Sequence, residues 1–95
     1  MTTEMAVLNV KKGLEKDFES AFKEAVQYIS RTKGYISHSL QKCIETKNRY
    51  LFTVQWATLD SHMINFRQST DYIKWKDLLH HFYDPTPVVE HYEEF

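Results

Sequence analysis

Residues 35–56 read YISHSLQKCIETKNRYLFTVQW, and this stretch decides the fold. Its second half, residues 49–56, is rich in aromatic and β-branched side chains, which strands prefer. Tyr50, Phe52, Val54 and Trp56 alternate with Leu51, Thr53 and Gln55, so the two sets point to opposite faces. Residues 45–48, ETKN, are typical of a turn. The stretch therefore predicts a hairpin with strands at 35–44 and 49–56.

The strand predicted at residues 35–44 has two unlike faces, and it is preceded in the chain by a helix and a further strand. For residues 35–44 the pattern places Ile36, His38, Leu40 and Ile44 on one face. Upstream, residues 5–10, MAVLNV, predict a further strand. Between them, a helix follows Gly13 and ends at residues 32–34, where Gly34 suits a left-handed cap. The apolar positions of that helix recur at helical spacing: Leu14, Phe18, Ala21, Phe22, Ala25, Val26 and Ile29.

Downstream of the hairpin, the sequence predicts a broken helical region and a last strand. Thr58 is a candidate cap for a helix that buries Leu59, Met63 and Phe66. A further helix starts at Ser69 or Thr70 and is stopped by residues 84–87, DPTP. Its inward residues are Tyr72, Trp75, Leu79 and Phe82. Residues 88–92, VVEHY, form the last strand.

The resulting order, β-α-β-β-α-β, predicts a ferredoxin-like α+β fold with an antiparallel sheet, in one domain over residues 1–95. Such a sheet has helices on one face only, yet Met5, Val7 and Leu51 place apolar side chains on the other. A large exposed apolar patch is rare in monomers. We therefore expect a homodimer that packs sheet against sheet; loops and the C-terminal tail are the alternative cover.

Composition excludes several classes of function. The net charge is −1 with no basic stripe, so we expect no nucleic-acid partner. No apolar run is long enough for a membrane span, and the N-terminus lacks a signal-peptide pattern, so we expect no membrane association. Cys43 is the single cysteine, so no internal disulfide forms. A cytoplasmic setting is the default expectation.

Three histidines are candidate catalytic bases: His38 on a strand, His62 beside Phe66 on a helix, and His91 on the last strand. Histidine exchanges protons near neutral pH. A hydrogen-bonded core or interface histidine is the alternative for each of them. His80 and His81 suit an exposed helix end, where the dipole favours a cation.

Four aromatic residues, Trp56, Phe66, Tyr72 and Trp75, have the size and shape to line a pocket for a flat ligand, although ordinary core packing gives the same spacing. We expect this pocket between the sheet and residues 58–82, with His62 on its wall and His38 as a neighbour. No metal-ligand spacing and no nucleotide-binding or nucleophile motif is present, so we expect no metal and no cofactor.

Nearly the whole chain resembles the antibiotic biosynthesis monooxygenase family. The resemblance lies in VLNVKKGLEKDFESAF, GYISHSLQKC, YLFTVQWATLDSH, NFRQSTDYIKW and LLHHFYDPTPVVEHY. It implies a dimeric α+β barrel and a monooxygenase that needs no cofactor and acts on a small aromatic or polyketide-like compound. A haem-degrading branch of the superfamily uses an Asn, a Trp and a His. Here Asn9 is shifted toward Gly13, Phe66 or a near neighbour stands at the position of the Trp, and Trp75 or Lys76 stands at the position of the His, so we do not expect haem degradation.

The resemblance also implies how such a reaction proceeds. A base removes a proton from an acidic phenol or anthrone, and the electron-rich anion then reacts directly with oxygen. His38, His62 and His91 have the chemistry of that base, and the four aromatic residues have the shape of the pocket. A non-catalytic dimer that binds a small molecule, or serves in a stress response, is the alternative.

Overall fold

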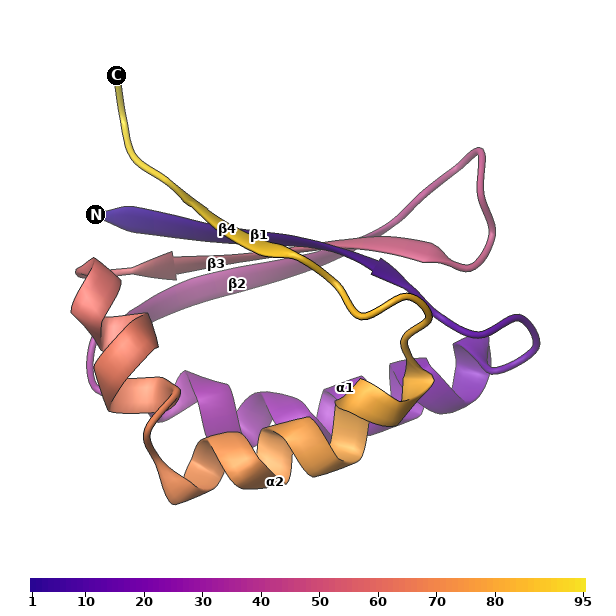
Figure 1. The fold of residues 1–95 in the computed structure, drawn as a ribbon, viewed down its shortest axis with the longest axis horizontal. Helices are drawn as coiled ribbons and strands as arrows, with labels where there is room; N and C mark the ends of the chain where they lie inside the picture. Colours follow the sequence, from indigo (N-terminus) through magenta and orange to yellow (C-terminus); the bar gives the residue numbers. More distant parts are fainter.

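The structure is a computed structural model that describes residues 1–95, and its sheet has one covered and one open face. Its elements are β1 (Thr2–Asn9), α1 (Glu15–Ser30), β2 (Tyr35–Lys42), β3 (Arg49–Trp56), η1 (Ser61–Phe66), α2 (Thr70–Leu79), η2 (His80–Phe82) and β4 (Val89–Tyr92). The sheet is antiparallel with the order β2-β3-β1-β4. Both long helices lie on one side of it (Figure 1). The predicted ferredoxin-like α+β fold is confirmed.

The covered face forms the core, as the alternation in the strands predicts. Tyr50, Phe52, Val54 and Trp56 of β3 are all buried, and their β1 neighbours Ala6 and Leu8 are buried as well. From the helix side, α1 buries Phe18, Phe22, Ala25 and Ile29. The predicted apolar face of this helix is therefore confirmed.

The predicted faces of β2 are wrong at two positions, Ile36 and Ile44; Ile44 lies beyond the end of the strand at Lys42 and is 96% exposed. The pairing of β2 with β3 shifts register between Tyr35 and Ser37, so the strict alternation breaks there. Ile36, expected beside His38, is 52% exposed, while Tyr35 packs against the core instead. The consequence is that Tyr35 and His38 share the face that looks towards α1.

The helical turn after β3 also differs from expectation. Residues 61–66 form a π-helix, in which the Arg67 N–H donates to the His62 carbonyl five residues back. Met63 within this turn and Leu59 just before it, both predicted to be buried, are 39% and 47% exposed. Phe66 is buried as predicted, and Ser61 and His62, which is only 2% exposed, are buried in place of the other two.

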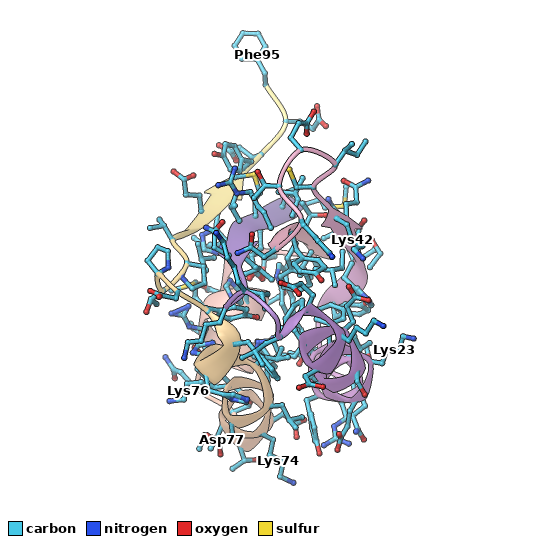
Figure 2. The ribbon with its side chains drawn as sticks, turned by 90° about the vertical axis from the view of Figure 1, so that its right-hand side faces the viewer. Lys23, Lys42, Lys74, Lys76, Asp77 and Phe95 are labelled. Atoms are coloured by element: carbon cyan, nitrogen blue, oxygen red, sulfur yellow. The ribbon has the colours of Figure 1, made fainter.

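The next helix follows its predicted signals. The Ser69 hydroxyl accepts a hydrogen bond from the Tyr72 N–H at 3.1 Å and caps α2. Trp75 and Leu79 are buried, and Phe82 follows them into the core from η2. Charged residues occupy the outside of this layer, as Lys23, Lys74, Lys76 and Asp77 show in Figure 2.

No element of the chain covers the other face of the sheet. Met5, Val7 and Leu51 lie there, with Val7 paired to Leu51 across the two central strands. Figure 1 shows the chain after β4 running away from the sheet, and Figure 2 shows Phe95 far from the helices. The C-terminal tail therefore does not cover this face within one chain.

Candidate functional site

The strand order separates the candidate histidines into two groups. His38 lies on β2 and His91 lies on β4, and these strands are the opposite edges of the sheet. His62 is close to His91: its Nδ1 lies 2.8 Å from His91 Nε2. The expectation that His38 is a neighbour of His62 is therefore wrong, because two strands separate β2 from β4.

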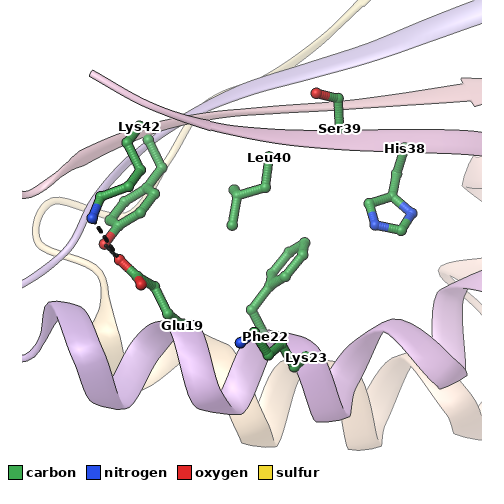
Figure 3. Close-up of a pocket in the computed structure, with 8 residues that line it drawn as sticks. Glu19, Phe22, Lys23, His38, Ser39, Leu40 and Lys42 are labelled. Carbon is green, nitrogen blue, oxygen red and sulfur yellow. Dashed lines mark hydrogen bonds and ion pairs between the residues drawn. The ribbon is translucent and has the colours of Figure 1, made fainter. Parts of the chain in front are cut away.

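His38 lines a cleft of about 360 Å³ between α1 and β2. Phe22 from α1 and Leu40 from β2 give the cleft its apolar part, and Lys23 and Lys42 lie at its rim (Figure 3). Figure 3 shows the His38 ring hanging from β2 towards α1, with one ring nitrogen on the side of Phe22. Apolar surface, an imidazole and two cations thus meet in one place.

The two ring nitrogens of His38 have different surroundings. Nδ1 lies 2.6 Å from the Tyr35 hydroxyl oxygen, a hydrogen-bond distance. Nε2 has no hydrogen-bond partner in the protein. Every buried side-chain nitrogen or oxygen in the structure has such a partner, so Nε2 is not buried and is accessible to solvent. Burial lowers the pKa of His38, so the ring is neutral at pH 7. When Nδ1 carries the ring proton and donates a hydrogen bond to the Tyr35 hydroxyl oxygen, the accessible Nε2 is unprotonated and can accept a proton.

The far end of the cleft is a polar cluster that the sequence reasoning missed. The Tyr50 hydroxyl donates to Glu19 Oε2 at 2.6 Å, and Lys42 Nζ lies 3.2 Å from the same oxygen. The hydrogen bond from Tyr50 lowers the pKa of Glu19. Burial, together with Glu19, raises the pKa of the Tyr50 hydroxyl, which stays protonated. The signal available in the sequence is that Glu19 precedes Phe22 by three residues, which places both on neighbouring positions of one helix face.

A second polar cluster lies inside the molecule around Glu4, which is 5% exposed. Trp56 Nε1 donates to Glu4 Oε1 at 3.0 Å, and His62 Nε2 lies 3.4 Å from that oxygen. The His62 ring stacks on Trp56 with centroids 5.3 Å apart. Burial raises the pKa of Glu4, whereas burial and the neighbouring His91 lower the pKa of His62 to about 4.

Glu4 is also a residue that sequence reasoning missed. The predicted strand began at residue 5, one position too late to include it. The signal in the sequence is the two-residue spacing: Glu4, Ala6 and Leu8 lie on the same face of the strand, and that face is buried. A carboxyl group on a core-facing position needs a hydrogen-bond partner, and the structure supplies one in Trp56, with His62 Nε2 3.4 Å from the same oxygen.

The four predicted pocket residues pack against one another. Phe66 contacts all three others, with ring centroids 6.0 Å from Trp56, 5.4 Å from Tyr72 and 5.9 Å from Trp75. None of the four lines any of the five principal pockets. Trp75 does reach the His38 cleft indirectly, because it lies against Phe22 with centroids 5.9 Å apart.

No three His, Cys, Asp or Glu side chains are grouped so that they could hold a metal ion. None of the helices is both long and apolar enough to cross a membrane.

Comparison with known proteins places the chain in a family. A profile described as "Antibiotic biosynthesis monooxygenase" matches residues 1–78. A Bacillus subtilis (strain 168) protein, YczJ, described as uncharacterized, is 51% identical over 94 residues, with 99% of each chain covered. A Bordetella bronchiseptica structure described as a "Putative antibiotic biosynthesis monooxygenase" is 34% identical, with a TM-score of 0.93, and the match covers 99% of this chain and 96% of that one.

A more distant structure has the same fold. SnoaB from Streptomyces nogalater, described as a cofactor-independent oxygenase, is 18% identical with a TM-score of 0.86, and the match covers 99% of this chain and 92% of that one. At this identity the likeness concerns the fold alone. The profile and the two closer relatives establish that the chain belongs to the antibiotic biosynthesis monooxygenase family.

Proposed function

We propose that the protein is a cofactor-independent monooxygenase that deprotonates a small, acidic aromatic or polyketide-like compound in the His38 cleft. One observation carries the proposal: an imidazole with an accessible Nε2 lies in a cleft that also holds apolar surface and two lysines. The imidazole can accept the proton of a flat phenolic compound, the apolar surface can bind its ring, and the lysines can stabilise the anion. Family membership and the description of SnoaB support the same reaction class.

His38 is the base in this proposal, rather than His62. Both ring nitrogens of His62 already face protein atoms, Nδ1 towards His91 and Nε2 towards Glu4. His38 keeps Nε2 for the substrate, while the Tyr35 hydroxyl holds the ring from the other side. When His38 takes a proton, the Nδ1–H···O bond to Tyr35 remains and stabilises the imidazolium.

The energy of the proton transfer limits the substrate class. A simple phenol has a pKa of about 10 and histidine about 6.5, so the transfer costs roughly 5 kcal/mol. Because burial lowers the pKa of His38, the cost for a simple phenol is larger still. Lys23 and Lys42 offset part of it by attracting the phenolate, although Lys42 also pairs with Glu19. A group that is more acidic than the phenol hydroxyl, such as the hydroxyl of a polycyclic enol that is the tautomer of an anthrone, therefore fits best.

The anion supplies the electrons for the reaction with oxygen. For an anthrone, a ring CH₂ becomes a carbonyl: one atom of O₂ enters the product and the other leaves as water. The substrate loses two hydrogens in this conversion, so no external reductant is consumed. The protein contributes the base, the cations and an apolar surface.

The aromatic residues have a supporting part in this proposal. Phe22 forms the floor of the cleft and packs against Phe52 and Trp75. Trp56, Phe66 and Tyr72 continue this packing behind Trp75. Any enlargement of the cleft towards the predicted pocket would begin by moving Phe22.

A binding module without catalysis is the second candidate function. The observation that favours it is that aromatic rings fill the interior, so the His38 cleft opens at the edge strand and is not enclosed. An open cleft excludes water poorly, which suits binding better than anion chemistry.

The test uses protein dialysed against a chelator and 1,8-dihydroxyanthrone as the probe. Under ¹⁸O₂, the proposal expects oxygen uptake and one labelled oxygen at the new carbonyl, at a rate above that of heat-denatured protein. Saturable binding of the probe without oxygen uptake would favour the binding module. Restoration of uptake only after a metal or flavin is added would overturn the cofactor-independent mechanism.

The proposed assembly is a homodimer through the open face of the sheet. Met5, Val7 and Leu51 form the apolar centre of this face, and no part of the chain covers them. A second copy of the sheet presents the same side chains, so one patch can cover the other around a two-fold axis.

A further inference from the structure

We propose that Glu4, His62 and His91 form a proton relay, and that His91 Nδ1, at its outer end, accepts a hydrogen bond from a neutral, hydroxyl-bearing small molecule. This site is distinct from the His38 cleft, since it lies at the β4 edge of the sheet. The three side chains come from β1, η1 and β4 and span the distance from the core to the surface.

The hydrogen-bond partners fix where the protons are. The indole N–H of Trp56 can only donate, so Glu4 Oε1 is an acceptor. A carboxylate 3.4 Å from His62 Nε2 favours a proton on that nitrogen. In the neutral ring His62 Nδ1 is then an acceptor, so His91 Nε2 donates to it across 2.8 Å. By elimination, His91 Nδ1 keeps its lone pair, and no protein group bonds to it.

A proton taken up at His91 can therefore be passed inward without creating a buried cation. The new proton binds His91 Nδ1, and the proton of His91 Nε2 moves to His62 Nδ1. The proton of His62 Nε2 then moves to Glu4. After the three transfers both histidines are neutral and have exchanged tautomers, and Glu4 is a neutral carboxylic acid.

The environment supports this end state. Glu4 lies among apolar residues, where burial raises its pKa and favours the protonated form. Arg67 acts on all three members: it disfavours a cation on His62 and on His91, and, like the hydrogen bond from Trp56, it lowers the pKa of Glu4, although burial outweighs both effects there. Protonation of either histidine to an imidazolium is therefore less favourable than protonation of Glu4.

The outer end of the relay opens into a cleft of about 250 Å³. His91 shares this cleft with Thr2, Leu59, Tyr92 and Glu93. It contains a carboxylate and no cation, so it does not suit an anionic ligand. A neutral molecule whose hydroxyl donates a hydrogen bond to His91, and keeps its proton, matches the lining.

The experiment is an NMR pH titration of ¹⁵N,¹³C-labelled protein that follows the imidazole nitrogens and the Glu4 carboxyl carbon. We expect His62 to change from the Nε2–H to the Nδ1–H tautomer at the same midpoint at which Glu4 becomes protonated. In Glu4→Gln, the amide oxygen still accepts a hydrogen bond from Trp56, but the relay has lost its final proton acceptor. The tautomer of His62 should then stay fixed, and His91 should titrate about one pH unit lower, a tenfold weaker proton affinity.

Glu93→Gln is the matched control, since it also replaces one carboxyl group near His91 by an amide but leaves the three relay residues intact. It should preserve the tautomer exchange of His62. An Nδ1–H tautomer of His62 at high pH, or separate midpoints for His62 and Glu4, would overturn the relay; the wild-type titration decides this even if Glu4→Gln fails to fold.

The ligand class has its own probe, phenol at millimolar concentration. Saturable shifts of the His91 ring signals in His38→Gln protein support it, and their absence overturns it. Because His38 is absent from this variant, the result is independent of the proposed oxygenase site.

Discussion

Replacement of Gly34 by alanine tests how the chain between α1 and β2 positions η1, which carries His62. Gly34 has a φ of +96°, and a Cβ built there would lie 2.5 Å from the Ser61 Cβ as well as against its hydroxyl oxygen. The left-handed backbone alone costs an alanine roughly 1–2 kcal/mol. Relief of the clash requires Ser61 to move, because its Cβ cannot rotate away.

Movement of Ser61 also disturbs hydrogen bonds. Its hydroxyl oxygen accepts from the Thr58 N–H at 3.3 Å and lies 3.0 Å from the Thr58 hydroxyl. Each such bond contributes about 0.5–1.5 kcal/mol. Gly34→Ala should therefore lower the free energy of unfolding by about 2–4 kcal/mol in a urea titration, and it should shift the His62 ring signals.

Gly13→Ala is the matched control. Gly13 has a similar φ of +92°, but a Cβ there meets no atom within 4 Å. It should lose only the backbone contribution of about 1–2 kcal/mol and leave His62 unchanged. In a Ser61→Gly background, the cost of Gly34→Ala should fall to the same level. Equal losses for Gly34→Ala and Gly13→Ala in the wild-type background would refute the close approach of Gly34 to Ser61.

Three further predictions concern the core, the pH dependence and the assembly. Phe22→Ala should destabilise the fold by about 3–5 kcal/mol, because it removes a buried ring packed on Phe52 and Trp75; an unchanged urea midpoint would contradict this packing. Because the pKa of His62 falls from 6.5 in the unfolded chain to about 4, the unfolded state binds the proton first, and unfolding becomes easier from pH 6.5 down to 4. The wild type should lose up to about 3 kcal/mol more than His62→Gln over this range, and parallel stability curves would show that His62 is not buried as a neutral ring. Light scattering should give twice 11.4 kDa, and Val7→Lys should halve this mass while Ile73→Lys on the exposed helix side should not; a monomeric wild type would contradict the dimer.

Much of the fold was predictable because its signals are local. The spacing of Phe18, Phe22 and Ile29 places them on one side of a helix whatever the helix packs against. The alternation in β3 fixes its faces in the same way. The Ser69 cap depends on a side chain and a backbone N–H three residues apart.

The failures arise where geometry departs from the regular period. A register shift in β2 exchanged Ile36 for Tyr35 on the face of His38. In the π-helical turn at residues 61–66, Met63 is exposed and His62 is buried, the reverse of the prediction for Met63. Neither irregularity has a signature in the apolar pattern, which assumes a period of 2.0 or 3.6.

The candidate site was less predictable because it depends on strand order. Which histidines meet is decided by the order β2-β3-β1-β4, a long-range property that no local pattern contains. The order places β4, with His91, next to β1, with Glu4, and both side chains contact His62. It leaves His38 at the other edge of the sheet, beside Tyr35. The sequence therefore provided the three candidate histidines but could not pair them.

The most direct test of the proposed function is the dependence of oxygen uptake on His38. With 1,8-dihydroxyanthrone and chelator-treated protein at pH 7, His38→Gln should lower kcat/KM by about 10²–10⁴-fold, the usual contribution of a general base. His81→Gln, an exposed histidine outside both clefts, should leave kcat/KM unchanged. Equal values of kcat/KM for wild-type and His38→Gln protein, with both folded, would contradict the assignment of His38 as the base.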